Sequence, residues 1–97
     1  MSQDLSEEKV ISYIEKTKKA FDEIKVNVPE NSHLGRIAKD FLEMAKSYFN
    51  DAHYFFEKGE LVNAFAAVNY AHGWLDAGAR IGLFDVGNDH ALFTLLD

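Results

Sequence analysis

Apolar residues recur at alternating steps of three and four along almost the whole chain, and this spacing constrains the fold more than any other feature. Such steps place residues on one face of a helix, which has 3.6 residues per turn. In the first segment the series is Val10, Ile14, Thr17, Phe21 and Ile24. In the second it is Leu34, Ala38, Phe41, Ala45, Tyr48, Ala52 and Phe55. The pattern predicts an all-α protein.

The expected helix ends come from capping and turn residues. Asp4 followed by Glu7 is a capping pair for the first helix, which we expect to end near Val26, ahead of the only proline in the chain. Either Asn31 or Ser32 is the N-cap of the second helix. These signals predict a first helix at about 4–26.

The second helix is expected at about 32–58 and the third at about 60–81. Gly59, between them, can take the left-handed conformation that ends a helix, so the two helices should form a tight antiparallel hairpin. The tail, 82–97, ends in the apolar residues Leu92, Phe93, Leu95 and Leu96. We expect it to dock on the bundle, with a short helix as one option.

The third segment is apolar on two sides. One side carries Leu61, Phe65, Val68, Ala71 and Leu75, and the other carries Ala67, Tyr70, Trp74 and Ile81. A helix of this kind is either central in its domain or also meets a partner. Ala66, Gly73 and Ala77 lie between the two sides and are expected to let another backbone approach closely. The whole chain, 1–97, is thus predicted to be one three-helix up-down bundle.

Composition excludes several classes of function. The net charge of −6 opposes non-specific binding of nucleic acid, and the absence of cysteine excludes disulfides and thiolate zinc sites. The most apolar run is interrupted by polar residues, so no membrane span is expected. The N-terminus has no basic and apolar leader pattern, so we expect a cytoplasmic protein.

Four polar residues on the third segment are the candidate binding site: Asn69, His72, Asp76 and Arg80. Arg80 can contact an anion, and His72 with Asp76 has the spacing of a histidine–carboxylate couple. The alternative is that the strip is the solvent edge of a buried helix and that His72 is a satisfied core histidine. A metal site needs more ligands than these, and no cofactor motif is present, so we expect no metal, no cofactor and no catalytic residue.

Three aromatic residues, Tyr54, Tyr70 and Trp74, are candidates for an interface, because such residues are enriched in protein contacts. The tail or the first helix could equally cover them. A chain of 97 residues buries a limited core, so association with a second copy or another protein is expected.

The stretch "YFFEKGELVNAFAAVNYAHGWLDAGARIGLFDV" (54–86), followed by "DHALFTLLD", resembles an archaeal family called domain of unknown function 357. The residues that carry the resemblance are Glu57, Lys58, Gly59, Ala64, Ala67, Tyr70, Trp74, Asp76, Gly78, Arg80, Gly82 and Phe84. It covers the last two thirds of the chain. It implies a small helical archaeal protein and no particular activity.

More distantly, the same stretch is similar to the four-helix HEPN domains, several of which are RNases or nucleotidyltransferase partners. Their arginine is followed four to six residues later by histidine, whereas here Arg80 is followed by His90 and Arg36 by His53. The resemblance therefore implies at most nucleotide or RNA association. We expect a non-enzymatic interaction or self-association module, with HEPN-like binding or a small-ligand site at Asp76 and Arg80 as alternatives.

Overall fold

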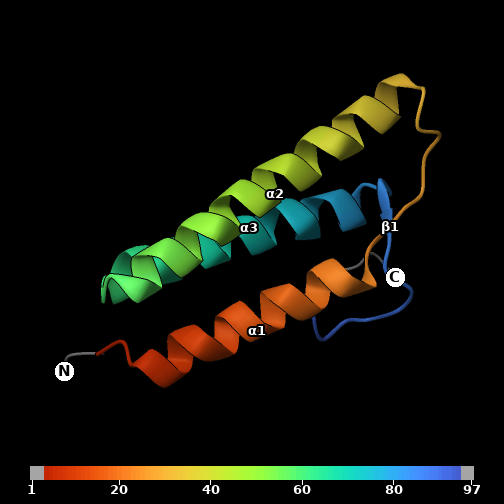
Figure 1. The fold of residues 1–97 in the computed structure, drawn as a ribbon. Helices are drawn as coiled ribbons and strands as arrows, with labels where there is room; N and C mark the ends of the chain where they lie inside the picture. The colour runs from red at the N-terminus through yellow and green to blue at the C-terminus, as the bar shows by residue number, and fades with distance from the viewer. Residues whose placement is uncertain (1–3, 95–97) are drawn as a thin grey trace.

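The computed structural model describes residues 4–94, which form three helices and a two-stranded ribbon (Figure 1). In chain order the elements are α1 (Glu7–Glu23), β1 (Lys25–Val26), α2 (His33–Glu57), α3 (Leu61–Arg80) and β2 (Phe84–Asp85). The all-α prediction and the three helices are confirmed. The short ribbon, in which β1 and β2 run antiparallel, is an addition that the periodicity does not indicate.

α2 and α3 form the predicted antiparallel hairpin, and α1 packs against the hairpin mainly through α3. In Figure 1, α2 lies uppermost, α3 lies beside it and α1 lies below. The hairpin turns at Gly59, whose φ of 77° is in the left-handed region that favours glycine. The backbone N–H of Glu60 donates to the carbonyl of Phe55 at 2.9 Å and closes the turn.

The close contact between α2 and α3 is made by alanines. Ala45 and Ala52 on α2 and Ala64 and Ala71 on α3 have no exposed surface at all. Side chains this small let two helices approach to the lower end of the usual 8–10 Å separation. Larger residues of α1, such as Val10, then close the core from the other side.

The prediction that Ala66, Gly73 and Ala77 mediate close packing is wrong within the described chain. All three are exposed, and a Cβ on Gly73 would have no atom within 4 Å. On α3, the glycine that does allow close packing is Gly78, where a Cβ would overlap the ring of Phe84. The sequence pattern identified the small residues correctly but assigned the wrong ones to the core.

The predicted start of α2 is confirmed, whereas both predicted ends of α1 are wrong by a few residues. Ser32 is the N-cap of α2, as expected, and its hydroxyl accepts the N–H of Gly35 at 2.9 Å. The N-cap of α1 is Ser6 rather than Asp4, because the Ser6 hydroxyl accepts the N–H of Lys9 at 3.1 Å. α1 also ends at Glu23, three residues before the expected end, because the next residues leave the helix to pair with β2.

The tail docks on the bundle, as predicted, but it has no helix within the described residues. After β2 the tail turns at Gly87, whose φ is 64°. It then buries Leu92 and Phe93 in a cluster with Ala20, Ala45 and Leu75. Asp89 organises this last turn, because its carboxylate accepts the backbone N–H groups of Ala91 and Leu92, both at 3.0 Å. Leu95 and Leu96 lie outside the described residues.

Candidate functional site

His72 on α3 joins three parts of the fold. Its Nε2 lies 2.6 Å from the carbonyl oxygen of Leu92 in the tail, and its Nδ1 lies 3.0 Å from the hydroxyl of Thr17 on α1. A carbonyl can only accept, so in the neutral imidazole Nε2 donates to Leu92 and Nδ1 accepts the hydroxyl proton of Thr17. Thr17 is itself buried, with 2% of its surface exposed. Both ring nitrogens therefore have internal partners.

Asp76 and Arg80 hold the tail as well. The carboxylate of Asp76 accepts the backbone N–H of Thr94 at 2.5 Å, and the guanidinium of Arg80 reaches the carbonyl of the same residue at 3.5 Å. Asn69 bonds within its own helix, to the carbonyl of Phe65 at 3.0 Å. The four polar candidates thus lie along one side of α3, and three of them contact the tail.

The carboxyl groups of Glu23, at the end of α1, and Asp89, in the tail, share a hydrogen bond. A hydrogen bond with Asp89 raises the pKa of Glu23 above its ordinary value, with burial and the repulsion of Asp89 acting in the same direction. The same hydrogen bond, with the backbone N–H of Leu92, lowers the pKa of Asp89. The ammonium of Lys19 lowers the pKa of both groups and reduces their repulsion.

The other side of α3 is apolar and open. Its exposed stripe consists of Val62, Ala66, Tyr70, Gly73, Ala77 and Ile81. The exposed fractions are 73% for Val62, 48% for Tyr70 and 64% for Ile81, values unusual for large apolar or aromatic side chains on a central helix. These residues follow one another at steps of four and three, so they form one line along the whole helix. We call this line the open stripe.

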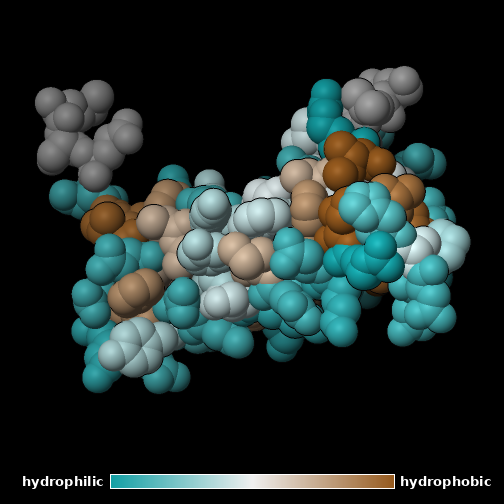
Figure 2. Space-filling model, turned by 90° about the horizontal axis from the view of Figure 1, so that it is seen from above, coloured by the Kyte–Doolittle hydropathy of each residue, from teal (hydrophilic) through white to brown (hydrophobic). Residues whose placement is uncertain are grey.

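Aromatic rings gather where the open stripe meets α2. Tyr70 stacks on Tyr48 with ring centres 4.4 Å apart, and Trp74 meets Phe41 edge to face at 5.0 Å. Together with Gly73 and Ala77, Phe41, Tyr70 and Trp74 line a groove of about 260 Å³. Seen from above Figure 1, on the side where α2 lies uppermost, the molecule shows hydrophobic side chains towards both ends, with paler and hydrophilic side chains between and around them (Figure 2).

The three aromatic interface candidates do not form one surface. Tyr70 and Trp74 share the groove, whereas Tyr54 lies on another side of α2, with the ammonium of Lys58 5.4 Å from its ring centre. Phe41 also lines the groove, whereas Tyr48 lines a neighbouring hollow with Ala66 and Tyr70. Neither Phe41 nor Tyr48 was predicted to be a surface residue. Their periodicity matched a core face, and only the position of α1 leaves their edge of the hairpin open.

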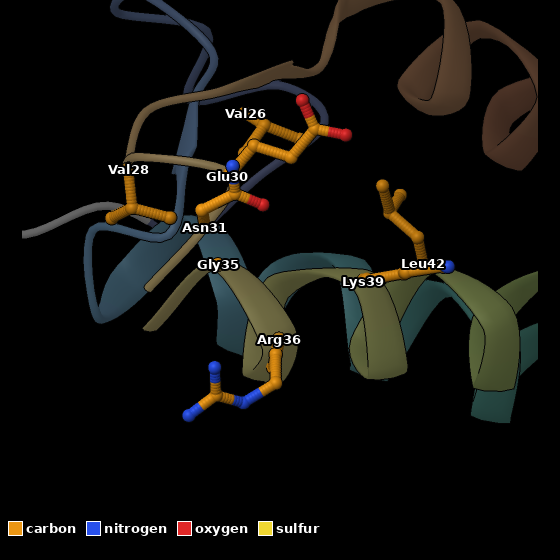
Figure 3. A pocket seen from close by; sticks show the side chains of 8 residues that line it. All are labelled: Val26, Val28, Glu30, Asn31, Gly35, Arg36, Lys39 and Leu42. Carbon is orange, nitrogen blue, oxygen red and sulfur yellow. The ribbon is translucent and has the colours of Figure 1, made fainter. Parts of the chain in front are cut away.

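A larger hollow than the groove lies elsewhere, between the β1–α2 loop and the first turns of α2, with a volume of about 580 Å³ (Figure 3). Its lining residues are Val26, Val28, Glu30, Asn31, Gly35, Arg36, Lys39 and Leu42. Gly35 is required there, because a Cβ would overlap the carbonyl oxygens of Pro29 and Glu30. The charged side chains are exposed, and that of Arg36 points away from the hollow in Figure 3. This hollow therefore lacks the converging buried polar groups of a ligand site.

Two classes of site have no counterpart in the described part of the chain. Residues 4–94 contain no group of three or more histidine or carboxylate side chains that could hold a metal ion. None of the helices in the same range has the length and apolarity needed to cross a membrane.

A family model described as a protein of unknown function, DUF357, matches residues 12–84. The chain belongs to this family. The match confirms the resemblance of the quoted stretch to this family, and it extends further towards the N-terminus than that stretch. DUF357 thus includes most of α1, the whole hairpin and the open stripe, while the tail residues that bind His72 and Asp76 lie beyond the match. No curated protein and no solved structure matches the chain.

Proposed function

We propose that this DUF357 protein is a non-enzymatic interaction module that docks a helix of a protein partner on the open face of α2 and α3. One observation carries the proposal: the open stripe runs the whole length of the central helix, and no described element covers it. Exposed apolar surface costs free energy in water unless something covers it.

The shape of the face favours a helix as the bound element. The small residues Gly73 and Ala77 line the groove together with the rings of Phe41, Tyr70 and Trp74. A helix laid into such a groove contacts it with residues at steps of three and four, and small residues on the floor let the backbones come close. A stripe on a 20-residue helix is about 30 Å long, enough for a partner helix of similar length.

The alternatives have less support. A small ligand at Asn69, His72, Asp76 and Arg80 would have to displace the tail, because three of the four already contact it. For RNA, the open stripe offers no lysine, and the chain has a net charge of −6, which opposes the electrostatic attraction that RNA binding uses.

The test compares Gly73→Glu with Ser47→Glu, which places the same charge on an exposed position of α2 away from the groove. Gly73 has open space around it, so the substitution should leave the fold intact, as circular dichroism can verify. Each tagged protein is recovered from source cells, and the proteins bound to it are quantified by mass spectrometry. We expect at least one partner to fall by about tenfold or more with Gly73→Glu only, since burying one unpaired charge costs well over 1.4 kcal/mol. Identical partner sets for both variants would contradict the proposal.

A further inference from the structure

We infer that the partner is a second copy of the same chain, docked with its α3 antiparallel to the first about a two-fold axis that passes between positions 71 and 72. The inference rests on the proposed function and names the occupant of the same face. It comes from the order of residues along the open stripe, which is self-complementary when one copy is reversed.

Reversal about that axis pairs bulky residues with small ones. Tyr70 comes opposite Gly73 of the second copy, and Ala66 comes opposite Ala77 of the second copy. The ring of Tyr70 is half exposed, and the space over Gly73 is empty to beyond 4 Å, so the ring of one copy can fill the gap on the other. In a two-fold interface every such contact occurs twice.

The ends of the stripe match as well. Val62 and Ile81, two of the most exposed large apolar residues of the described chain, lie at equal distances from the axis and come opposite each other. Their burial removes apolar surface from water at both ends of the contact. Tyr70 is the remaining exposed large hydrophobic residue of the open stripe, and it already lies at the centre of the interface.

Charge favours the same arrangement. Arg80 is the one cation of α3, and it lies between the tail, which its guanidinium reaches, and the open stripe. Reversal brings Arg80 opposite Asn63 of the second copy. The amide of Asn63 donates to the carboxylate of Glu60 at 3.0 Å, so the guanidinium arrives next to an acidic group. A parallel arrangement would instead place Arg80 against Arg80 and Tyr70 against Tyr70. Antiparallel helices also align their dipoles favourably.

The available area predicts a reversible dimer. A face about 30 Å long and about 20 Å wide, the width of two helices, offers on the order of 600 Å² per copy. Stable interfaces use about 800 Å² per partner, so this contact lies at the low end of the standard range. We therefore expect a dimer that dissociates at micromolar protein, detectable as a concentration-dependent mass in analytical ultracentrifugation.

The register is testable because the chain has no cysteine, so an introduced thiol is unique. Under mild oxidation, Ala66→Cys mixed with Ala77→Cys should give a disulfide-linked dimer, whereas each variant alone should remain largely unlinked. Ser47→Cys, at an exposed position of α2 that does not line the groove, should not link to either variant. In ultracentrifugation, Gly73→Glu should shift the protein to monomer at concentrations where the wild type and Ser47→Glu are dimeric.

The outcomes separate this inference from the proposed function. Efficient linking of Ala66→Cys to itself would indicate a parallel contact and overturn the antiparallel register. If the wild type remains monomeric at millimolar concentration, the inference that the partner is a second copy is wrong. If Gly73→Glu nevertheless loses another protein in the recovery experiment, the interaction module stands without self-association. If it loses none, both proposals fall.

Discussion

The two unusual sides of α3 differ in what covers them. The side with His72, Asp76 and Arg80 looks like a binding site in the sequence, but its polar atoms bind the chain's own tail and Thr17. The side with Tyr70 and Gly73 looks like a core packing face, but it lies open. Polar side chains on a central helix can thus serve the fold, while apolar ones mark the surface available to a partner.

The largest expected effect tests the covered side by making a cavity in it. Leu75 of α3 is fully buried among residues of α1, α2 and the tail, so Leu75→Ala should lower the free energy of unfolding by about 2–5 kcal/mol. Val62→Ala, on the open side, should change it by no more than about 0.5 kcal/mol in dilute protein. Urea denaturation measures both. A large loss from Val62→Ala in the monomer would mean that the open side is covered after all.

The next effect tests the connection of His72 to the tail. His72→Ala leaves the buried hydroxyl of Thr17 and the carbonyl of Leu92 without their partner, which should cost about 2–3 kcal/mol. Amide hydrogen exchange in 89–94 should accelerate more than in α2. His53→Ala, at an exposed position, is the matched control. It should neither lower the free energy of unfolding nor accelerate exchange in the tail. Unchanged exchange in the tail would show that other contacts suffice to hold it.

A matched pair of glycine substitutions compares the two sides directly. Gly78→Ala should destabilise the protein by about 1–3 kcal/mol, because the new methyl group overlaps the ring of Phe84. Gly73→Ala should stabilise the monomer by about 1 kcal/mol, because alanine is the better helix former and the space is open. Thermal unfolding of dilute protein measures the change in melting temperature for each variant. Changes of the same sign would contradict a packed Gly78 and an open Gly73.

The smallest effect concerns the carboxyl pair at the end of α1. The pKa of Glu23 is raised, so its contribution to stability is present below the ordinary glutamate pKa of 4.5 and is lost as pH rises through the raised value. The pKa of Asp89 is lowered, so its contribution is lost only as pH falls through that lowered value. The pair should therefore stabilise most in mildly acidic solution.

Glu23→Gln keeps a donor for Asp89 and removes the repulsion. The melting temperature of Glu23→Gln should therefore fall less than that of the wild type as pH rises from mildly acidic to neutral. Lys19, the charged group that faces both carboxyls, is left in place. Glu15→Gln, which removes an exposed charge from the same helix, should leave the profile unchanged. A profile for Glu23→Gln that matches the wild type would show that the pair does not act on stability.

Much of the fold could be predicted from local signals. The steps of three and four along α2 and α3, the hydroxyl of Ser32 and the left-handed Gly59 depend on neighbours only a few residues away. Errors arose where a distant segment competed with a local preference. The last residues predicted for α1 instead pair with β2, which is almost sixty residues further along the chain.

The candidate site shows the same division. The sequence by itself determined which residues of α3 are polar, small or aromatic, and at what spacing, because helical geometry converts spacing into sides. Only the tertiary structure decided which side is open. α1 and the tail pack against the side of Leu75 and His72 and leave that of Tyr70 and Gly73 uncovered. The physical reason is that burial depends on contacts between segments distant in the chain, and a local pattern does not specify them.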